Sequence, residues 1–392
     1  MSSYSPRTLE STLSLEASEF PLILIEGMPC VGKTTLAKHF FSTLPYIDLS
    51  DIQARSIAMS QPEAFFSLHG KRLLIDSVEQ APELFKHLPS FEKDTKIVLV
   101  GNLPQEIKED LKNNCNLHVY QLSPFSQREI NGLGSEPFGA SGALPITITY
   151  PQSFFFETIR HGFLPRPHPS QSTRGFYDLW LSRFFKETVQ GVMNVAKLDL
   201  FLLYMKALAE NNMREINHSR LAKDCRISYA TAIYWTQFLL DCGVLREVKS
   251  LKLAQRRQVK RGKIIYADTG LLCHLLNIGG ADELLASSFY EQIFSGFVAS
   301  EIMKGYEAWG LEPPLYFYRD TAKKHVELIL QTKKGYMPIG FMSQRARPIH
   351  DQIRHMDVLR RMGEICTDNV YITDGSLMVE KTDSPLISAT RL

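Results

Sequence analysis

The sequence predicts an α/β protein whose first third is built on a parallel β-sheet. Three observations support this prediction. Short apolar runs typical of buried strands alternate with helical segments in this part of the chain. The first of these runs leads into a glycine-rich loop that opens a helix. With 44% hydrophobic and 22% charged residues among 392, the composition is that of a folded globular chain of two or three domains.

The glycine-rich loop spans residues 27–34 and matches the phosphate-binding pattern G-x-x-x-x-G-K-[ST]. It lies between the apolar run 22–25 and a helical stretch, which is the context that the pattern requires. In such a loop the backbone N–H groups and the lysine, here Lys33, contact phosphates, and the hydroxyl of Thr34 holds Mg²⁺. We therefore expect an ATP and Mg²⁺ site rather than a purely structural strand–turn–helix. The expected nucleotide-binding residues are Gly27, Met28, Pro29, Cys30, Val31, Gly32, Lys33, Thr34 and Thr35.

Later apolar runs predict the remaining strands of this sheet. The run 72–76 ends in Asp76, and a buried strand that delivers a carboxylate in this way completes the Mg²⁺ shell of such sites. The run 96–102 ends in the polar residue Asn102. Two shorter strands are predicted at 46–49 and 118–122. The ligand of a parallel sheet binds beyond the carboxyl ends of its strands, so we expect the nucleotide at that edge.

Charge and cysteine content exclude several classes of protein. The net charge is +2, from 44 basic and 42 acidic residues, so any basic surface must be local. The six cysteines form no C-x-x-C pair, which argues against a disulfide scaffold or a cysteine-rich zinc site. No apolar run approaches the ~18 residues of a membrane span, and the first residues lack the layout of a signal peptide. We expect a cytoplasmic protein without a membrane partner.

The order of these motifs resembles that of prokaryotic AAA-type ATP-binding proteins fused to a C-terminal domain of unknown function. The loop of that family ends V-G-K-T-T-L, as residues 31–36 do, and its strand ending I-D-E with a following Q-x-x-P is similar to residues 74–85. Residues 122–129 are similar to its P-L-S-x-x-E element, and residues 263–272 to its K-x-Y-x-x-D-T-G-L-L signature. The resemblance implies a P-loop ATPase domain, a helical and winged-helix domain, and a domain similar to restriction endonucleases. The expected boundaries are 1–160, 161–280 and 281–392.

Two positions depart from this family in residues tied to hydrolysis. The acid that would polarise the attacking water is replaced by Ser77, which cannot act as a general base at neutral pH. A family arginine aligns with Asn116, which cannot supply positive charge to a transition state. We therefore expect a Mg-ATP-dependent conformational switch with weak or absent hydrolysis. An active ATPase that uses Glu79 or a residue of another subunit stays open, as does an oligomer. The catalytic candidates are Lys33, Asp76, Glu79 and Asn102.

A helix-turn-helix is predicted between residues 219 and 243, with Ser228 as the N-cap of its second helix. Eight basic residues and one glutamate follow between residues 246 and 263, and a basic hairpin after a helix-turn-helix is typical of a winged helix. Such charge can neutralise DNA phosphates, and a protein partner is the equally open alternative. The second helix would offer Tyr229, Thr231 and Trp235 as exposed contacts. The candidate nucleic-acid contacts are Arg256, Arg257, Lys260 and Arg261.

The last domain of the family resembles nucleases in which two acids and an E-x-K pair hold Mg²⁺ and assist the nucleophile. Here Ser295 replaces the first acid, while Gly340 and Met342 stand at the E-x-K positions. Two acids, Glu301 and Glu327, remain. Neither glycine nor methionine supplies a carboxylate or moves a proton, so we expect a binding or packing module without nuclease activity.

Overall fold

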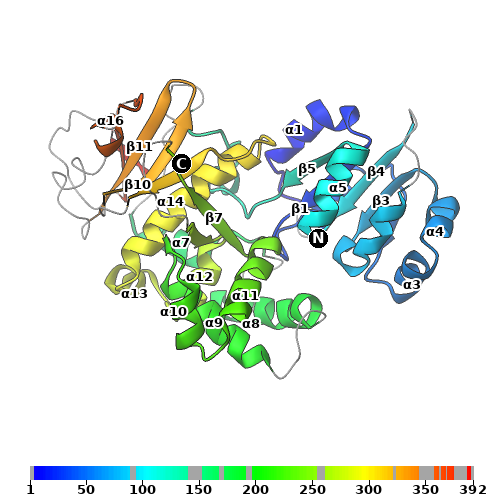
Figure 1. Cartoon of the computed structure of the whole chain (residues 1–392), viewed down its shortest axis with the longest axis horizontal. Helices are drawn as coiled ribbons and strands as arrows, with labels where there is room; N and C mark the ends of the chain where they lie inside the picture. Colours follow the sequence, from blue (N-terminus) through cyan, green and yellow to red (C-terminus); the bar gives the residue numbers. More distant parts are fainter. Residues whose placement is uncertain are drawn as a thin grey trace.

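The computed structural model places most of the chain in defined elements (Figure 1). It describes residues 4–88, 94–139, 152–166, 172–190, 197–253, 261–320, 324–343, 357–361, 363–367, 369–374 and 386–389. No helix within these ranges is both long enough and apolar enough to cross a membrane.

The first part of the chain contains the predicted parallel sheet, in the order β2-β3-β4-β1-β5. Its strands are β1 (Leu22–Glu26), β2 (Tyr46–Asp48), β3 (Arg72–Asp76), β4 (Lys96–Val100) and β5 (Leu117–Gln121). Alternate residues of β1 face two different cores, Leu22 and Leu24 on one side and Ile23 and Ile25 on the other. This is the burial that a near-continuous apolar strand in a two-sided sheet requires. The predicted α/β class is confirmed.

Helices cover both faces of this sheet. They are α1 (Leu9–Glu16), η1 (Ala17–Glu19), α2 (Lys33–Phe40), α3 (Ile52–Ser60), α4 (Pro62–His69), η2 (Val78–Gln80), η3 (Pro82–His87), α5 (Gln105–Cys115) and α6 (Gln127–Ile130). The core between the sheet and helices α3, α4 and α5 contains Phe65 and Ile107, and all of its residues come from the first part of the chain. The core on the opposite face continues without a break into residues from Phe138 onwards. The rest of the chain is therefore packed against this second face.

The middle of the chain is mainly helical. Its elements are α7 (Gln152–His161), α8 (Thr173–Arg183), the π-helical η4 (Phe184–Val189), α9 (Leu198–Glu210), β6 (Arg214–Glu215), α10 (His218–Asp224), α11 (Tyr229–Asp241), β7 (Leu245–Ser250), β8 (Lys263–Tyr266), α12 (Thr269–Leu275) and α13 (Ala281–Ala286). The hydroxyl of Ser228 accepts a hydrogen bond from the Thr231 amide at 3.0 Å, so the predicted N-cap of α11 is confirmed.

One side chain of α11, that of Trp235, is buried although the sequence predicted it to be exposed. Trp235 was expected to be exposed, but only 2% of it is accessible. It shares a helix face with Ala232 and Leu239, and its ring packs edge-on against Phe201 and Tyr204 of α9. The i, i+3, i+4 spacing of these apolar positions assigns Trp235 to the core. The prediction for this residue is therefore wrong, whereas Tyr229 is 56% exposed as expected.

The last part of the chain adds a long helix and a second sheet. Its elements are α14 (Tyr290–Glu307), β9 (Leu315–Arg319), β10 (His325–Thr332), β11 (Gly335–Met342), α16 (Val358–Arg361), β12 (Val370–Thr373) and β13 (Leu386–Ser388). The second sheet has the order β13-β12-β11-β10-β9-β7-β8-β6 within the described residues. Strands β7 and β9 pair in parallel through Lys249 with Tyr316 and Ser250 with Phe317. One sheet thus spans the boundary that the sequence analysis placed at residue 280.

Candidate phosphate-binding site

The loop between β1 and α2 adopts the conformation that its glycines predict. Gly27 has φ 153° and Gly32 has φ 99°, both in the region that favours glycine. A Cβ at Gly27 would lie 2.1 Å from the carbonyl oxygen of Leu122, so no larger residue fits there. Cys30 also has a positive φ, 64°, which is uncommon outside glycine. The loop is therefore held in a tight turn that ends at the first residue of α2.

Lys33, the first residue of α2, folds back over this loop. Its ammonium donates hydrogen bonds to the carbonyl oxygens of Gly27 at 2.7 Å and Met28 at 3.2 Å. Burial lowers the pKa of Lys33, and the nearby carboxylates of Glu79 and Asp76 oppose that shift. The lysine is thus a half-buried cation that faces two acids and the beginning of the loop.

Asp76 lies at the carboxyl end of β3, separated from β1 by one strand. It is 6% exposed, and its two oxygens accept hydrogen bonds from the Tyr46 hydroxyl at 2.9 Å and the Ser77 amide at 2.7 Å. The hydroxyl of Ser77 donates to Asp48 at 2.9 Å. Ser77 therefore ties the ends of β2 and β3 together, which is a structural use of the position where the family has its acid.

Glu79 lies in the short 3-10 helix η2, which begins two residues after Asp76. Its carboxylate accepts a hydrogen bond from the backbone N–H of Asn102 at 3.3 Å. A Cβ at Gly101 would lie 2.1 Å from Oε2 of Glu79, so glycine leaves room for this carboxylate. Burial raises the pKa of Glu79, and Lys33 is the first of the groups that oppose the shift. A strand pattern does not predict this placement, because the turn and not the strand positions the residue.

Asn102 fixes the first residue of the loop. Its side-chain oxygen accepts from the Gly27 amide at 3.0 Å, and its side-chain nitrogen donates to the Gly27 carbonyl at 3.1 Å. The structure therefore brings together all four of the predicted catalytic residues, which are Lys33, Asp76, Glu79 and Asn102. Asn116 is not among them. It ends α5 at the amino end of β5, whereas the loop follows the other end of the neighbouring strand β1.

The loop opens into a pocket of about 600 Å³. Residues 30–36 form one wall, and Tyr4 and Phe125 of the first part of the chain also line it. Two arginines, Arg166 and Arg183, reach the pocket from the helical middle part. Arg166 donates to Thr173 Oγ1 at 3.2 Å and lies over the ring of Phe176. No sequence signal marks either arginine, because Arg166 stands in a proline-rich stretch and Arg183 at the end of an aromatic helix.

The middle part of the chain also contacts the backbone of the loop directly. Gly243, in the turn after α11, has φ 69°, and a Cβ there would lie 2.9 Å from the Met28 amide nitrogen. The indole of Trp180 on α8 donates to the Pro29 carbonyl at 3.1 Å. Cys242, the residue before Gly243, is buried, and burial raises the pKa of its thiol. The phosphate loop is therefore enclosed between the sheet and the helices that follow it.

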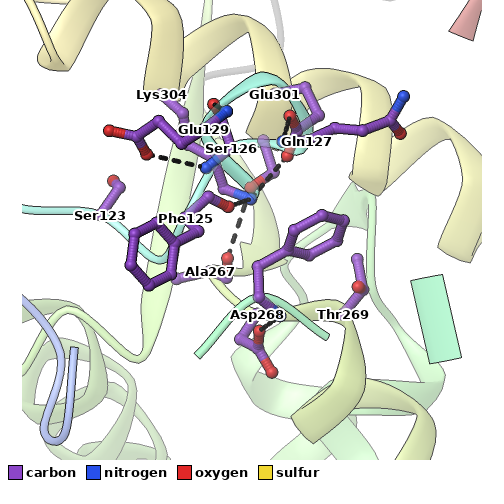
Figure 2. A network of polar contacts seen from close by, with 12 residues as sticks. Ser123, Phe125, Ser126, Gln127, Glu129, Ala267, Asp268, Thr269, Glu301 and Lys304 are labelled. Carbon is purple, nitrogen blue, oxygen red and sulfur yellow. Dashed lines mark hydrogen bonds and ion pairs between the residues drawn. The ribbon is translucent and has the colours of Figure 1, made fainter. Parts of the chain in front are cut away.

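A buried network fixes the segment after β5 to α14 (Figure 2). Glu301 and Lys304 form an ion pair at 2.6 Å, and the Glu301 side chain is 0% exposed. Glu301 also accepts from the Gln127 amide at 2.7 Å, while Lys304 donates to the Phe125 carbonyl at 3.0 Å. Close by, Asp268 caps α12 and accepts from the Phe163 amide at 2.6 Å. Two of the segments that resemble the family, residues 122–129 and 263–272, thus contribute contacts that hold separate elements together.

The nuclease-like positions have mainly structural partners. Ser295 donates to the Glu291 carbonyl at 2.7 Å, Glu301 pairs with Lys304, and Glu327 pairs with Lys263. Gly340 and Met342 lie on β11, paired with β12. Within the described residues, no three His, Cys, Asp or Glu side chains gather as a metal site would require.

The basic segment is partly used inside the molecule. Three of its residues form ion pairs, Arg246 with Glu307, Lys249 with Glu312 and Lys263 with Glu327. Arg261 is exposed. The other nucleic-acid candidates, Arg256, Arg257 and Lys260, lie outside the described residues. The three paired residues are not among the four predicted nucleic-acid contacts, so that prediction stays untested.

Comparisons with known proteins agree with the geometry of the loop. Residues 19–131 match the model of an AAA domain, and residues 153–282 match that of a domain of unknown function (DUF8612). No curated protein matches the chain.

Solved structures similar to the chain include two archaeal proteins. The Walker-type ATPase PABY2304 of Pyrococcus abyssi is 12% identical, with a TM-score of 0.39 over 68% of this chain and 94% of that one. The ORC2 protein of Aeropyrum pernix is 13% identical, with a TM-score of 0.27 over 71% and 93%. The matched models, the parallel sheet and the phosphate loop together show that the N-terminal region is a P-loop domain of the AAA type, followed by a domain of unknown function.

Proposed function

We propose that the chain is a Mg-ATP-binding conformational switch. The phosphates would lie against Lys33 and the loop amides, and Thr34 and Asp76 would hold Mg²⁺. The pocket of about 600 Å³ between the loop and Tyr4 has the size of small-molecule sites and room for the rest of the nucleotide. The observation that carries the proposal is the contact of Gly243 and Trp180 with the loop backbone, because it links the loop to the helices that follow the sheet.

Two arginines of the pocket would couple nucleotide binding to a change in conformation. Arg166 and Arg183 belong to the middle part of the chain and line the same pocket as Lys33. Phosphate charge would attract both cations and so favour one arrangement of that part relative to the sheet. In the family an arginine aligns with Asn116, and these two residues would replace its charge from a different element.

The first test is ATP affinity measured by calorimetry in the presence of Mg²⁺. We expect Lys33→Ala to weaken binding by at least about tenfold, since it removes a half-buried cation from the phosphates. Lys112→Ala, an exposed lysine on α5, is the control and should bind like the unaltered chain. Hydrogen exchange at residues 238–250 then reports the switch, and we expect protection there to change with ATP. Equal affinity in Lys33→Ala and the control would refute nucleotide binding at the loop.

Hydrolysis by Glu79 is a second candidate function, favoured by the placement of its carboxylate beside Asn102 and Lys33. A carboxylate whose pKa is raised by burial is a better base near neutral pH than an ordinary one. Glu79→Gln should then stop phosphate release while ATP binding is retained. The rate should fall on the acid side of the pH profile at a pH above the usual glutamate pKa, because only the ionised form accepts a proton. Release that persists in Glu79→Gln would assign the base to another residue or subunit.

We further propose that residues 197–266 form a winged helix, and that its role is to pack against the phosphate loop through the turn after α11. The order α9, β6, α10, α11, β7 and β8, with β8 between β6 and β7, supports this interpretation. A DNA-binding role has weaker support, because three basic residues of the hairpin are paired internally. It would require DNA affinity that falls with salt and with neutralisation of Arg256, Arg257, Lys260 and Arg261. Affinity of this kind would favour the alternative function, a DNA-binding regulator that acts through the winged helix, over a module that packs within the chain.

A further inference from the structure

A second cavity lies within the domain of unknown function and takes no part in the site described above. Its volume is about 340 Å³, and residues of α7, α8, α9, α12 and the turn after α12 line it. Apolar side chains such as Leu181 and Leu202 form part of the wall. A cavity of this size, with an apolar wall and a few polar groups, is typical of small-molecule sites.

The charged groups of this cavity are unbalanced. Arg160, Arg174 and Lys206 contribute three positive charges, whereas Asp178 is the one acidic residue among the described residues of the lining. Asp178 pairs with His274 at 3.2 Å, and Arg160 pairs with Glu157 at 2.8 Å. Arg174 and Lys206 make no hydrogen bond or ion pair with any residue in the part of the chain that the structure describes.

Arg174 and Lys206 line the same cavity from two different helices. Arg174 comes from the first turn of α8 and Lys206 from the middle of α9, and both act electrostatically on His274 of α12. Burial is the main cause that lowers the pKa of His274; the charge of Asp178 opposes the shift, and those of Arg174 and Lys206 add to it. Two helices, α8 and α9, therefore bring two cations to the side of the cavity where Asp178 pairs with His274.

We propose that this cavity binds a small organic anion, a phosphate monoester or carboxylate with an apolar body. Arg174 and Lys206 would bind the charged group, and Leu181 and Leu202 would contact the apolar part. An arginine and a lysine together suit a phosphate, because guanidinium binds two oxygens at once and ammonium acts as a point charge. The inference concerns a different cavity from the phosphate loop and does not depend on ATP binding there.

The test is calorimetric titration with phenyl phosphate and benzoate, with neutral benzyl alcohol for comparison. We expect both anions to bind, and the double variant Arg174→Gln/Lys206→Gln to weaken them by at least about tenfold through the loss of two nearby charges. Asp178→Asn should strengthen binding severalfold, because it removes the single negative charge of the lining. Lys223→Gln, an exposed lysine on α10 outside the cavity, is the matched control.

Each outcome decides the proposal. Absence of anion binding at concentrations on the order of 10 mM would overturn it. So would unchanged affinity in the double variant, or equal binding of benzyl alcohol, which would show an apolar cavity without anion recognition. Phenyl phosphate binding that Lys33→Ala removes and Arg174→Gln/Lys206→Gln leaves intact would place the anion in the phosphate loop. That result would reject the second cavity and leave the proposed function standing. The altered side chains are exposed or half-buried, so circular dichroism should show native folding in every variant.

Discussion

Replacement of Gly243 by alanine tests whether the middle part of the chain is docked on the phosphate loop. Gly243 follows α11 with φ 69°, and the Val244 amide donates back to the Leu239 carbonyl at 3.0 Å, so the helix ends in a glycine turn. A methyl group there would meet two obstacles. The first is the left-handed backbone, and the second is the Met28 amide nitrogen at 2.9 Å from the new Cβ.

Each of these two effects adds its own free-energy cost, and the two costs can be measured separately. An alanine in the left-handed region costs about 1–2 kcal/mol. Overpacking against a backbone that cannot move without shifting the loop adds about 1–3 kcal/mol. The expected loss of stability is therefore about 2–5 kcal/mol for Gly243→Ala. Because the loop itself is displaced, ATP affinity should fall by about tenfold or more.

Gly132 provides the matched control. It follows α6 with φ 71°, the Leu133 amide donates back to the Arg128 carbonyl at 2.9 Å, and nothing lies within 4 Å of a Cβ at that position. Gly132→Ala should cost only the backbone term of about 1–2 kcal/mol and leave ATP affinity unchanged. The assay is urea denaturation of both variants, followed by calorimetry with Mg-ATP. Equal losses of stability and equal ATP affinities in the two variants would refute the docking of the turn on the loop.

Three further predictions each concern one polar contact of the structure. Trp180→Phe removes the hydrogen bond to the Pro29 carbonyl but retains the stacking on Phe184, and should lower the free energy of unfolding by about 1 kcal/mol in urea; a loss of 3 kcal/mol or more would show that packing, not the bond, is what matters. Lys304→Met leaves the carboxylate of Glu301 buried without its partner and should cost about 3–5 kcal/mol, whereas Glu301→Gln/Lys304→Met should recover part of that loss in the same measurement. Without such recovery, the ion pair would not be the cause. Asn102→Ala removes two hydrogen bonds to Gly27 and should weaken ATP binding by about tenfold, as measured by calorimetry, while Asn114→Ala on the exposed face of α5 should not.

The sheet and the loop at its carboxyl edge could be predicted because both depend on local patterns. Apolar strands of five residues, glycines at fixed spacing and polar residues at strand ends each leave a signal in a short window. The face of a helix is harder to predict when apolar residues surround it. Tyr229, Ile233, Tyr234 and Trp235 on α11 are all large, and only contact with α9 decides that Trp235 is the buried one.

The parts of the site that come from distant segments left no such signal. Glu79 reaches Asn102 because the chain makes a 3-10 turn after Asp76, and strand periodicity does not predict a turn. Arg166, Arg183 and Gly243 meet the loop only through tertiary packing. The same holds for the basic segment, since the glutamates that pair with Arg246, Lys249 and Lys263 lie more than fifty residues further along the chain.

The pairing of β7 with β9 has a consequence for any shortened form of the protein. Strand β7 has β8 on one side and β9 on the other, so its backbone groups are shared by two parts of the chain. A chain cut after residue 280 would lose β9 and expose the hydrogen-bonding edge of β7, with Val248 and Leu251 beside it. Unpaired edges of this kind add strands from other molecules. Such a fragment should therefore associate with itself as its concentration rises, even if every element that remains is correctly folded.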